Sequence, residues 1–351
     1  MPNLNYKEEL SGFTLNAGET RTISSPGELK GVVTVNTGGK LFIRDIALTF
    51  AADSQIIVDG GTVELSGVTF TANGSLGPLL IISEKTPVFT ATSCVFDGSG
   101  KAQLIKTAAA KTDLTDCTFS NGFVRGTPVK KATSNTSFVF QFAKAMNSSV
   151  NDIEPAGAAI ESYGALHTTN CNFVNNIAET AAGAINSYGR VQISNCVFKD
   201  CQSKGIGGAL VARDIYVLTL CTFESCTAVG NGGAVFLLGG THTDSSLEQC
   251  SFNKCTTSES GGGCRVENRY YKVNNNVFTD CSAAQIGGGV SALGADQCNS
   301  MLNMNTFTNC IAQKGGAIAR QQTSIAQSYS PKLNNNHYVS CKPDNDICIL
   351  I

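Results

Sequence analysis

One short phrase recurs between Asn170 and Ile318, and it constrains the fold more than any other feature of the chain. A Phe is followed eight or nine residues later by a small-residue cluster rich in Gly, and this Phe returns at intervals of 25, 25, 29, 26 and 29 residues. Self-similarity at such a period indicates a solenoid, whose repeats bury their apolar faces only against one another. The recurring residues are Phe173, Phe198, Phe223, Phe252, Phe278 and Phe307.

Within each repeat the apolar residues alternate, as Val191 and Ile193 do. Period two is the pattern of a β-strand, whereas a helical repeat would place apolar residues three and four apart. Strands of one coil would pair in parallel with those of the next coil about 4.8 Å away, so like residues would stack into columns. We therefore predict an all-β chain that forms a single-stranded parallel β-helix of about twelve coils. Tight bends are expected three residues after each Phe and at each Gly pair.

The boundaries of this solenoid follow from where the phrase fades. Residues 1–30 lack it, and we expect an N-terminal cap there because a solenoid end exposes strand edges. The β-helix should occupy residues 31–341. The 54 residues from Phe119 to Phe173 are enough for two coils, so an irregular coil or an insertion is expected near residues 125–150. Residues 342–351 should form an apolar cap or docking segment, in which Ile347–Ile351 is covered by the chain itself, by a partner, by the next copy or by a continuation of the natural chain beyond Ile351.

The 15 Cys residues fall mostly into two columns, two residues before the Phe and three residues after it. Neighbours in a column would stand near the strand spacing, which is wider than the roughly 3.8 Å between the Cβ atoms of a disulfide. We therefore expect buried free thiols that fill space, and Asn residues in the same columns that bond the neighbouring coil. The spacing does not fit a zinc site, and no metal or other cofactor is expected. The second column contains Cys201, Cys226, Cys255, Cys281 and Cys310.

Charge and hydropathy disfavour two classes of function, nucleic-acid binding and a role as a transmembrane protein. The net charge is -2, so there is no basic excess to hold a phosphate backbone, and nucleic-acid binding is disfavoured. Apolar runs are too short to span a bilayer, and no transmembrane segment is expected. The N-terminal residues lack the apolar core of a secretory signal, which predicts a cytoplasmic protein if Met1 is the true start.

Bulky polar residues gather 13 to 19 residues after each Phe, which would place them on one lateral face. Carboxylates on such a face could act on a glycosidic bond, and the candidate catalytic acids are then Asp214, Glu267 and Asp296. No two of these acids share an offset in neighbouring coils, so a solvated or partner-binding face is favoured over catalysis. The candidate binding residues are Tyr188, Arg190, Asp214, Tyr216, Arg265, Glu267, Arg269, Tyr270 and Asp296.

The phrases resemble the repeats of the chlamydial polymorphic outer membrane proteins, which are defined by Gly-Gly-Ala-Ile and Phe-x-x-Asn. Gly315-Gly316-Ala317-Ile318 matches the first phrase, and Phe173-Val174-Asn175-Asn176 matches the second. The resemblance covers about residues 150 to 320. It implies a right-handed β-helix of the pectin-lyase-like superfamily that serves as an adhesin at the cell surface.

The function favoured by these observations is a non-catalytic adhesive or structural module that presents a regular lateral face to protein or glycan partners. One alternative is a polysaccharide lyase or glycoside hydrolase on the same fold. Another is an intracellular structural rod within a larger assembly, which the unpaired thiols favour.

Overall fold

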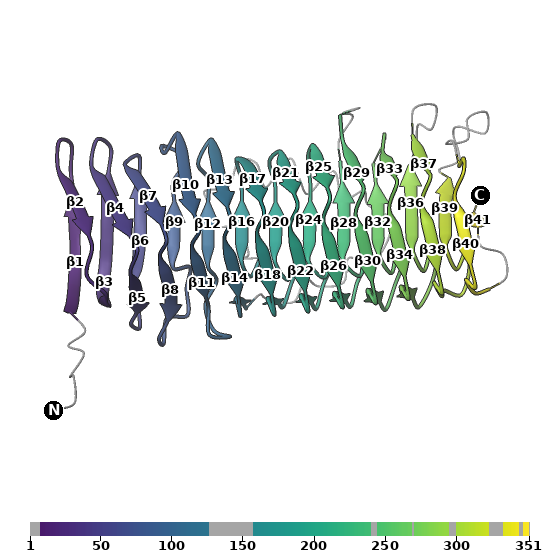
Figure 1. Cartoon of the computed structure of the whole chain (residues 1–351), viewed down its shortest axis with the longest axis horizontal. Helices are drawn as coiled ribbons and strands as arrows, with labels where there is room; N and C mark the ends of the chain where they lie inside the picture. The colour runs from purple at the N-terminus through teal and green to yellow at the C-terminus, as the bar shows by residue number, and fades with distance from the viewer. Residues whose placement is uncertain are drawn as a thin grey trace, which may run out of the picture.

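The chain forms a parallel β-helix, and Figure 1 shows its coils following one another along a rod from the purple N-terminal end to the yellow C-terminal end. The computed structural model describes residues 8–125, 157–239, 244–268, 270–294, 300–322, 333–343 and 347–350. Within these ranges there is no helix, and every pairing between named strands is parallel. The predicted fold class is therefore confirmed.

One coil contains four short strands, as the coil after Ala184 illustrates. It runs through β20 (Ile185–Ser187), β21 (Val191–Ser194), β22 (Val197–Lys199) and β23 (Gln202–Ser203) before β24 (Leu210–Ala212) pairs with β20. Each of these strands has a counterpart one coil earlier and one coil later. The strands therefore line up in faces that run along the rod, three of them through most of its length and the fourth only from β15 (Phe123–Val124) to β35 (Ser282–Ala283).

The 24-stranded sheet contributes two of these faces, which are joined near the N-terminus because β3 (Gly27–Asn36) pairs with strands of both. The first, here called the Phe face, also contains β5 (Ala47–Phe50), β8 (Thr69–Ala72), β11 (Val95–Asp97), β14 (Thr118–Ser120), β18 (Asn172–Val174), β22, β26 (Thr222–Glu224), β30 (Ser251–Asn253), β34 (Val277–Thr279), β38 (Thr306–Thr308) and β40 (His337–Val339). The second, here called the Gly face because each strand follows a Gly cluster or its equivalent, also contains β6 (Gln55–Asp59), β9 (Leu80–Ile82), β12 (Ile105–Thr107), β16 (Ile160–Ser162), β20, β24, β28 (Val235–Leu238), β32 (Cys264–Glu267), β36 (Val290–Gly294), β39 (Ile318–Gln322) and β41 (Ile347–Leu350).

Two further sheets complete the coils. The 11-stranded sheet, here called the second sheet, contains β2 (Thr20–Ile23), β4 (Lys40–Arg44), β7 (Thr62–Ser66), β10 (Val88–Thr92), β13 (Lys111–Thr115), β17 (Ala165–Thr169), β21, β25 (Tyr216–Thr219), β29 (Ser246–Glu248), β33 (Lys272–Asn274) and β37 (Met301–Asn303). The 6-stranded sheet contains β15 (Phe123–Val124), β19 (Ile177–Ala178), β23, β27 (Thr227–Ala228), β31 (Thr256–Thr257) and β35 (Ser282–Ala283).

The stacked Phe column runs through the interior as predicted. From Phe96 to Phe307 the rings of successive coils lie parallel within 8°, with centroids 4.6 to 4.9 Å apart. Near the N-terminus the order loosens, because Phe50 meets Phe70 edge-on at 76°. All these Phe side chains are fully buried. The column therefore includes Phe50, Phe70, Phe96 and Phe119, which the sequence also predicts as the anchors of shorter, more degenerate coils.

The Cys columns are also interior. Every described thiol is free and buried, and those of the second column lie 3.5 to 3.6 Å from the carbonyl oxygen of the Phe one coil earlier, as Cys201 does from Phe173. Where Asn replaces Cys it makes the predicted ladder: Asn276 Nδ2 donates to Asn305 Oδ1 at 3.0 Å and to the Leu247 carbonyl at 2.9 Å. Both residue types thus cross-link neighbouring coils.

The coils from Phe173 to Phe307 each turn at three left-handed corners, of which the sequence predicts two. The coil of Phe198 has positive φ at Asn195, Asp200 and Gly207. The Gly pair is required because Gly207 has a φ of 61°, and because a Cβ at Gly208 would collide with the Gly233 carbonyl oxygen. The corner three residues before each Phe is unpredicted, since Leu, Gln and Met occupy it in some coils and leave no turn signature.

The N-terminal segment differs from the predicted cap. Residues 8–15 form β1 (Glu8–Leu15), which pairs with β3, and β2 pairs with β4 in the same way. Coils are therefore already present at residue 8, the first described residue, within the segment assigned to the cap. A bulge between Ser11 and Phe13 interrupts the register of β1 with β3, so the period-two pattern is less regular there than in later strands.

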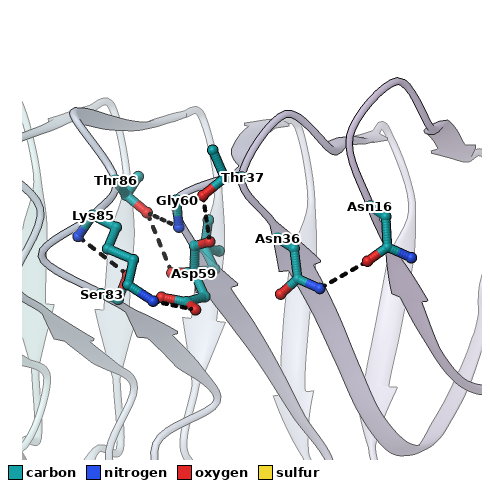
Figure 2. A network of polar contacts seen from close by, with 9 residues as sticks. Asn16, Asn36, Thr37, Asp59, Gly60, Ser83, Lys85 and Thr86 are labelled. Atoms are coloured by element: carbon teal, nitrogen blue, oxygen red, sulfur yellow. Dashed lines mark hydrogen bonds and ion pairs between the residues drawn. The ribbon is translucent and has the colours of Figure 1, made fainter.

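Side chains bind the turns of these first coils to one another (Figure 2). Asn36 Nδ2 donates to Asn16 Oδ1 at 3.0 Å, and Lys85 Nζ lies 2.9 Å from Asp59 Oδ2. The hydrogen bond from Lys85, followed by one from Ser83, lowers the pKa of Asp59. These polar groups satisfy one another across coils, which is a structural role.

The interval from Phe119 to Phe173 contains no additional coil. β14 pairs directly with β18, and the two rings stack with centroids 4.9 Å apart. The sequence allows an irregular coil or an insertion in this interval. The direct pairing of β14 with β18 fits an insertion. Residues 126–156 lie outside the described ranges. At the other end, β41 pairs with β39 and extends the Gly face, so Ile347–Leu350 continues the stack.

Leu220 offers a test of the unpredicted corner. Its φ is 55°, which is costly for a branched side chain, and 57% of its surface is exposed. One coil earlier, Asn195 Nδ2 donates to Asn170 Oδ1 at 2.8 Å. Leu220→Asn would relieve the strain and extend this ladder, so we expect it to raise the free energy of unfolding by about 1 kcal/mol.

Thermal and urea unfolding would measure the effect of Leu220→Asn, with Val229→Asn as the matched control. Val229 is similarly exposed at 55% but is not at a positive-φ position. Equal changes in the two variants would show that the corner carries no strain.

Candidate functional site

The structure separates the residues of the predicted lateral strip. Tyr188 and Asp214 are partly exposed and Arg190 is exposed, in the turns that lead from the Gly face to the second sheet. Tyr216, in contrast, is fully buried as the first residue of β25, where it occupies the position that Val191 has one coil earlier. Tyr216 is therefore a core residue, and burial raises the pKa of its hydroxyl. Arg269 and Asp296 lie outside the described residues.

Arg265 and Glu267 pair with each other on β32. Arg265 Nε and Nη2 both lie 2.9 Å from Glu267 Oε1, and Arg265 is buried, with 5% of its surface exposed. Its Nη1 also donates to Ser291 Oγ. The Glu267 carboxylate is thus an ion-pair partner. Asp214 follows β24, and β28 lies between that strand and β32, so the two candidate acids are two coils apart. Tyr270 is partly exposed beyond β32.

A more concentrated polar group, here called the Glu161 cluster, lies on the outer side of β16 and β20. Glu161 is the middle residue of β16 and is fully buried. Tyr163 Oη donates to its Oε1 at 2.7 Å, and Gln103 Nε2 donates to its Oε2 at 3.3 Å. Burial raises the pKa of the Glu161 carboxyl, although these hydrogen bonds and the charges of Lys106 and Arg213 oppose the shift.

An aromatic and cationic stack borders this carboxyl. The rings of Tyr163 and Tyr188 are parallel within 1°, with centroids 4.9 Å apart. The Arg213 Cζ lies 5.1 Å from the Tyr188 centroid, and the Lys106 Nζ lies 6.0 Å from the Tyr163 centroid. Tyr163, Tyr188 and Arg213 each follow the last residue of a Gly-face strand, so coil stacking brings them together one above another. Cations over aromatic faces are favourable at about 0.5 to 2 kcal/mol each.

Asn186 connects the two parts of the Glu161 cluster. It follows Glu161 in the same outward column of the Gly face and is fully buried. Arg213 Nε donates to Asn186 Oδ1 at 3.1 Å, while the Asn186 Nδ2 has no hydrogen-bond partner. Burial lowers the pKa of Arg213, and the nearby Tyr188 and Glu161 oppose that shift. The arrangement holds the Arg213 guanidinium in place, and it leaves the buried Asn186 Nδ2 without a hydrogen-bond acceptor.

Sequence reasoning missed Glu161 because its surroundings disguise the repeat. The preceding Gly157-Ala158-Ala159-Ile160 is a variant of the Gly phrase with Ala in the second position. Its distance from the preceding Phe119 is lengthened by the irregular stretch, so it falls off the period. Reading Gly-Ala-Ala-Ile as the phrase would have aligned Glu161 with Asn186 and with Arg265.

Other chemistries find less support. Among the described residues, no group of three or more His, Cys, Asp or Glu side chains is arranged to hold a metal ion. The described ranges also contain no apolar helix of bilayer-spanning length. Comparisons with protein-family models, with curated proteins and with solved structures gave no match to the chain. The resemblance to the chlamydial repeats therefore stays a prediction that rests on the two phrases.

The buried carboxyl makes a prediction about pH. Because the pKa of Glu161 is raised in the fold, its contribution to stability is complete below its ordinary value of 4.5 and is lost as pH rises through the folded pKa. Replacing it by the neutral isostere in Glu161→Gln should remove this dependence. We expect the variant to gain on the wild type as pH rises above about 4.5.

Urea unfolding of both proteins from pH 4 to pH 8 would measure this, with Glu84→Gln as the control because Glu84 is exposed. A stability difference between wild type and Glu161→Gln that stays constant over this range would contradict a raised pKa.

Proposed function

We propose that the chain is a non-catalytic binding module that contacts a macromolecular partner, either protein or glycan, through the turns that follow its Gly-face strands. The observation that carries this proposal is the Arg213 guanidinium, which is held in place by Tyr188 and Asn186 on the outside of the rod. Ordering a long side chain at a surface costs conformational entropy, and for Arg213 these contacts have already ordered it before a partner binds. Arg and Tyr are also among the residues that most often anchor protein interfaces.

The β-helix suits such a role because its faces are rigid and regular. Every strand of the Gly face from β12 to β36 is hydrogen-bonded to strands on both sides, so a side chain in the turn directly after such a strand is anchored on a rigid frame. Rigid display reduces the ordering cost of binding. The resemblance to surface adhesins points to the same role, and it favours a location at the cell surface.

The enzymatic alternative receives less support from the candidate acids. The Glu267 carboxylate is bound by Arg265, which disfavours its use as a proton donor or a nucleophile. The acid with the raised pKa, Glu161, is fully buried and is not within the sequence-predicted set. Neither arrangement provides the pair of accessible carboxyl groups that glycosidic bond cleavage needs.

An intracellular rod is the second candidate, and the buried thiols favour it. The thirteen free Cys residues described here would be exposed to oxidation in every unfolded chain, which a reducing compartment prevents. In the folded state their burial raises the pKa of thiols such as Cys226 and Cys264, which suppresses their reactivity.

Incubation with neutral and acidic polysaccharides would separate a binding module from an enzyme. We expect no new reducing ends and no unsaturated products from the wild type, and no change in Asp214→Asn or Glu267→Gln. Binding to arrayed proteins and glycans should weaken in Arg213→Ala and persist in Lys272→Ala, which alters the second sheet. Turnover that either acid substitution abolishes would show instead that the chain is an enzyme.

A further inference from the structure

Two arginines of the Gly face are fixed by their neighbours, and they differ in one respect. Arg265 has the Glu267 carboxylate 2.9 Å away. Arg213 has no carboxylate oxygen within 4.0 Å among the described residues, and its hydrogen bond goes to the neutral amide of Asn186. It is partly exposed. A guanidinium carries five donors in a planar fork, so most of the hydrogen-bonding capacity of Arg213 is unused within the fold.

The chemistry of Asn186 strengthens this contrast. Since a guanidinium only donates, the Asn186 atom that faces Arg213 Nε must be the oxygen, and the amide cannot be flipped without losing this bond. The Nδ2 group is consequently fixed without an acceptor in a fully buried position. Leaving a buried donor unsatisfied costs about 1 to 3 kcal/mol. The Arg213 and Asn186 pair therefore has several N–H donors without partners, while its one side-chain acceptor, Asn186 Oδ1, is already used.

We propose that Arg213 is the docking point for a carboxylate group of a partner protein, with Asn186 positioning the guanidinium for it. This inference rests on the proposed binding function and specifies its partner. A carboxylate matches the guanidinium fork with two parallel hydrogen bonds, as the Arg265 and Glu267 pair shows in part on the same face. An acidic segment of a protein supplies such groups.

The surroundings of Arg213 favour a protein over a sugar. Sugar rings commonly pack on an open aromatic face, but both faces of the Tyr188 ring are occupied, one by Tyr163 and the other by Arg213. On the next coil the equivalent position is Leu238, a partly buried residue that packs against Val211 and Phe236. Arginine beside tyrosine edges and an apolar residue is the composition of a protein interaction hot spot.

The first test measures binding of an oligoglutamate peptide to the full chain, using polygalacturonate and heparin as glycan probes. We expect Arg213→Gln to weaken peptide binding by about ten- to hundredfold, since one charge-assisted bidentate contact is lost. Arg190→Gln removes the same charge from an exposed residue that makes neither the aromatic contact nor the side-chain hydrogen bond of Arg213. It should change the affinity less than about twofold. Arg213→Lys should behave like Arg213→Gln, because an ammonium lacks the fork.

The second variant, Asn186→Asp, supplies the carboxylate from within the fold. The new oxygen would face Arg213 Nε at the position of the present amide oxygen. Because Glu161 stacks directly on this position, the variant is made in a Glu161→Gln background, which removes the neighbouring carboxyl. Relative to that background we expect it to raise the melting temperature and to abolish peptide binding, a combination that a purely structural role for Asn186 would not produce. A lowered melting temperature with unchanged binding would contradict the inference.

Each other outcome is also decisive. Equal losses in Arg213→Gln and Arg190→Gln would indicate general charge attraction and overturn the inference. Binding of polygalacturonate or heparin that depends on Arg213, without peptide binding, would replace the protein partner with an anionic glycan and leave the binding function intact. If the wild type binds none of the three probes, the inference fails, while the proposed function still stands or falls on its own binding arrays.

Discussion

Parallel pairing between successive coils is the constraint on which the rest of this structure depends. Each backbone N–H in the strands is used by the coil above or below, so the rise per coil is fixed near one strand spacing. Side chains must then repeat at that spacing, and the Phe rings do so at 4.6 to 4.9 Å. This distance suits parallel aromatic stacking, so backbone pairing and core packing reinforce each other. A globular core could not impose such regularity on residues 25 to 29 positions apart.

The same constraint explains which residues share a column. An interior position beside a corner must accept a neighbour of its own kind. Asn does so by donating from one amide to the next, as Asn276 does to Asn305, and Cys does so without needing a strong partner. On the outer side of the Gly face the column is mixed, passing from Glu161 through Asn186 to Val211, Phe236 and Arg265. Because the backbone of this face is regular, the residues that vary in this column are the ones that can give it a specific binding contact.

Most of the fold could be predicted from the sequence because period-two alternation and a repeating phrase are both local signals. The Phe and Cys columns followed from that repeat alone. What could not be predicted depends on contacts between coils. Tyr216 is polar by composition but takes an inward position, and Glu161 is hidden behind a variant phrase after an irregular stretch. The corner at Leu220 carries no turn residue, since its conformation is imposed by the strands on either side. Of the candidate site, the sequence identified Tyr188 but neither Arg213 nor Asn186, whose roles exist only after stacking.

Coil-to-coil register, rather than local sequence, brings the side chains of the candidate site together. The register is least constrained by the sequence where β14 pairs with β18 and β12 pairs with β16, because residues 126–156 separate these strands in the chain. The same register places Gln103 and Lys106 beside Glu161. Nuclear Overhauser contacts between selectively labelled Phe rings measure this register directly in solution. We expect a contact between Phe119 and Phe173, whose ring centroids are 4.9 Å apart, as strong as the one between Phe173 and Phe198 at 4.6 Å. A clear contact for the second pair with none for the first would place another coil between Phe119 and Phe173 and contradict this register.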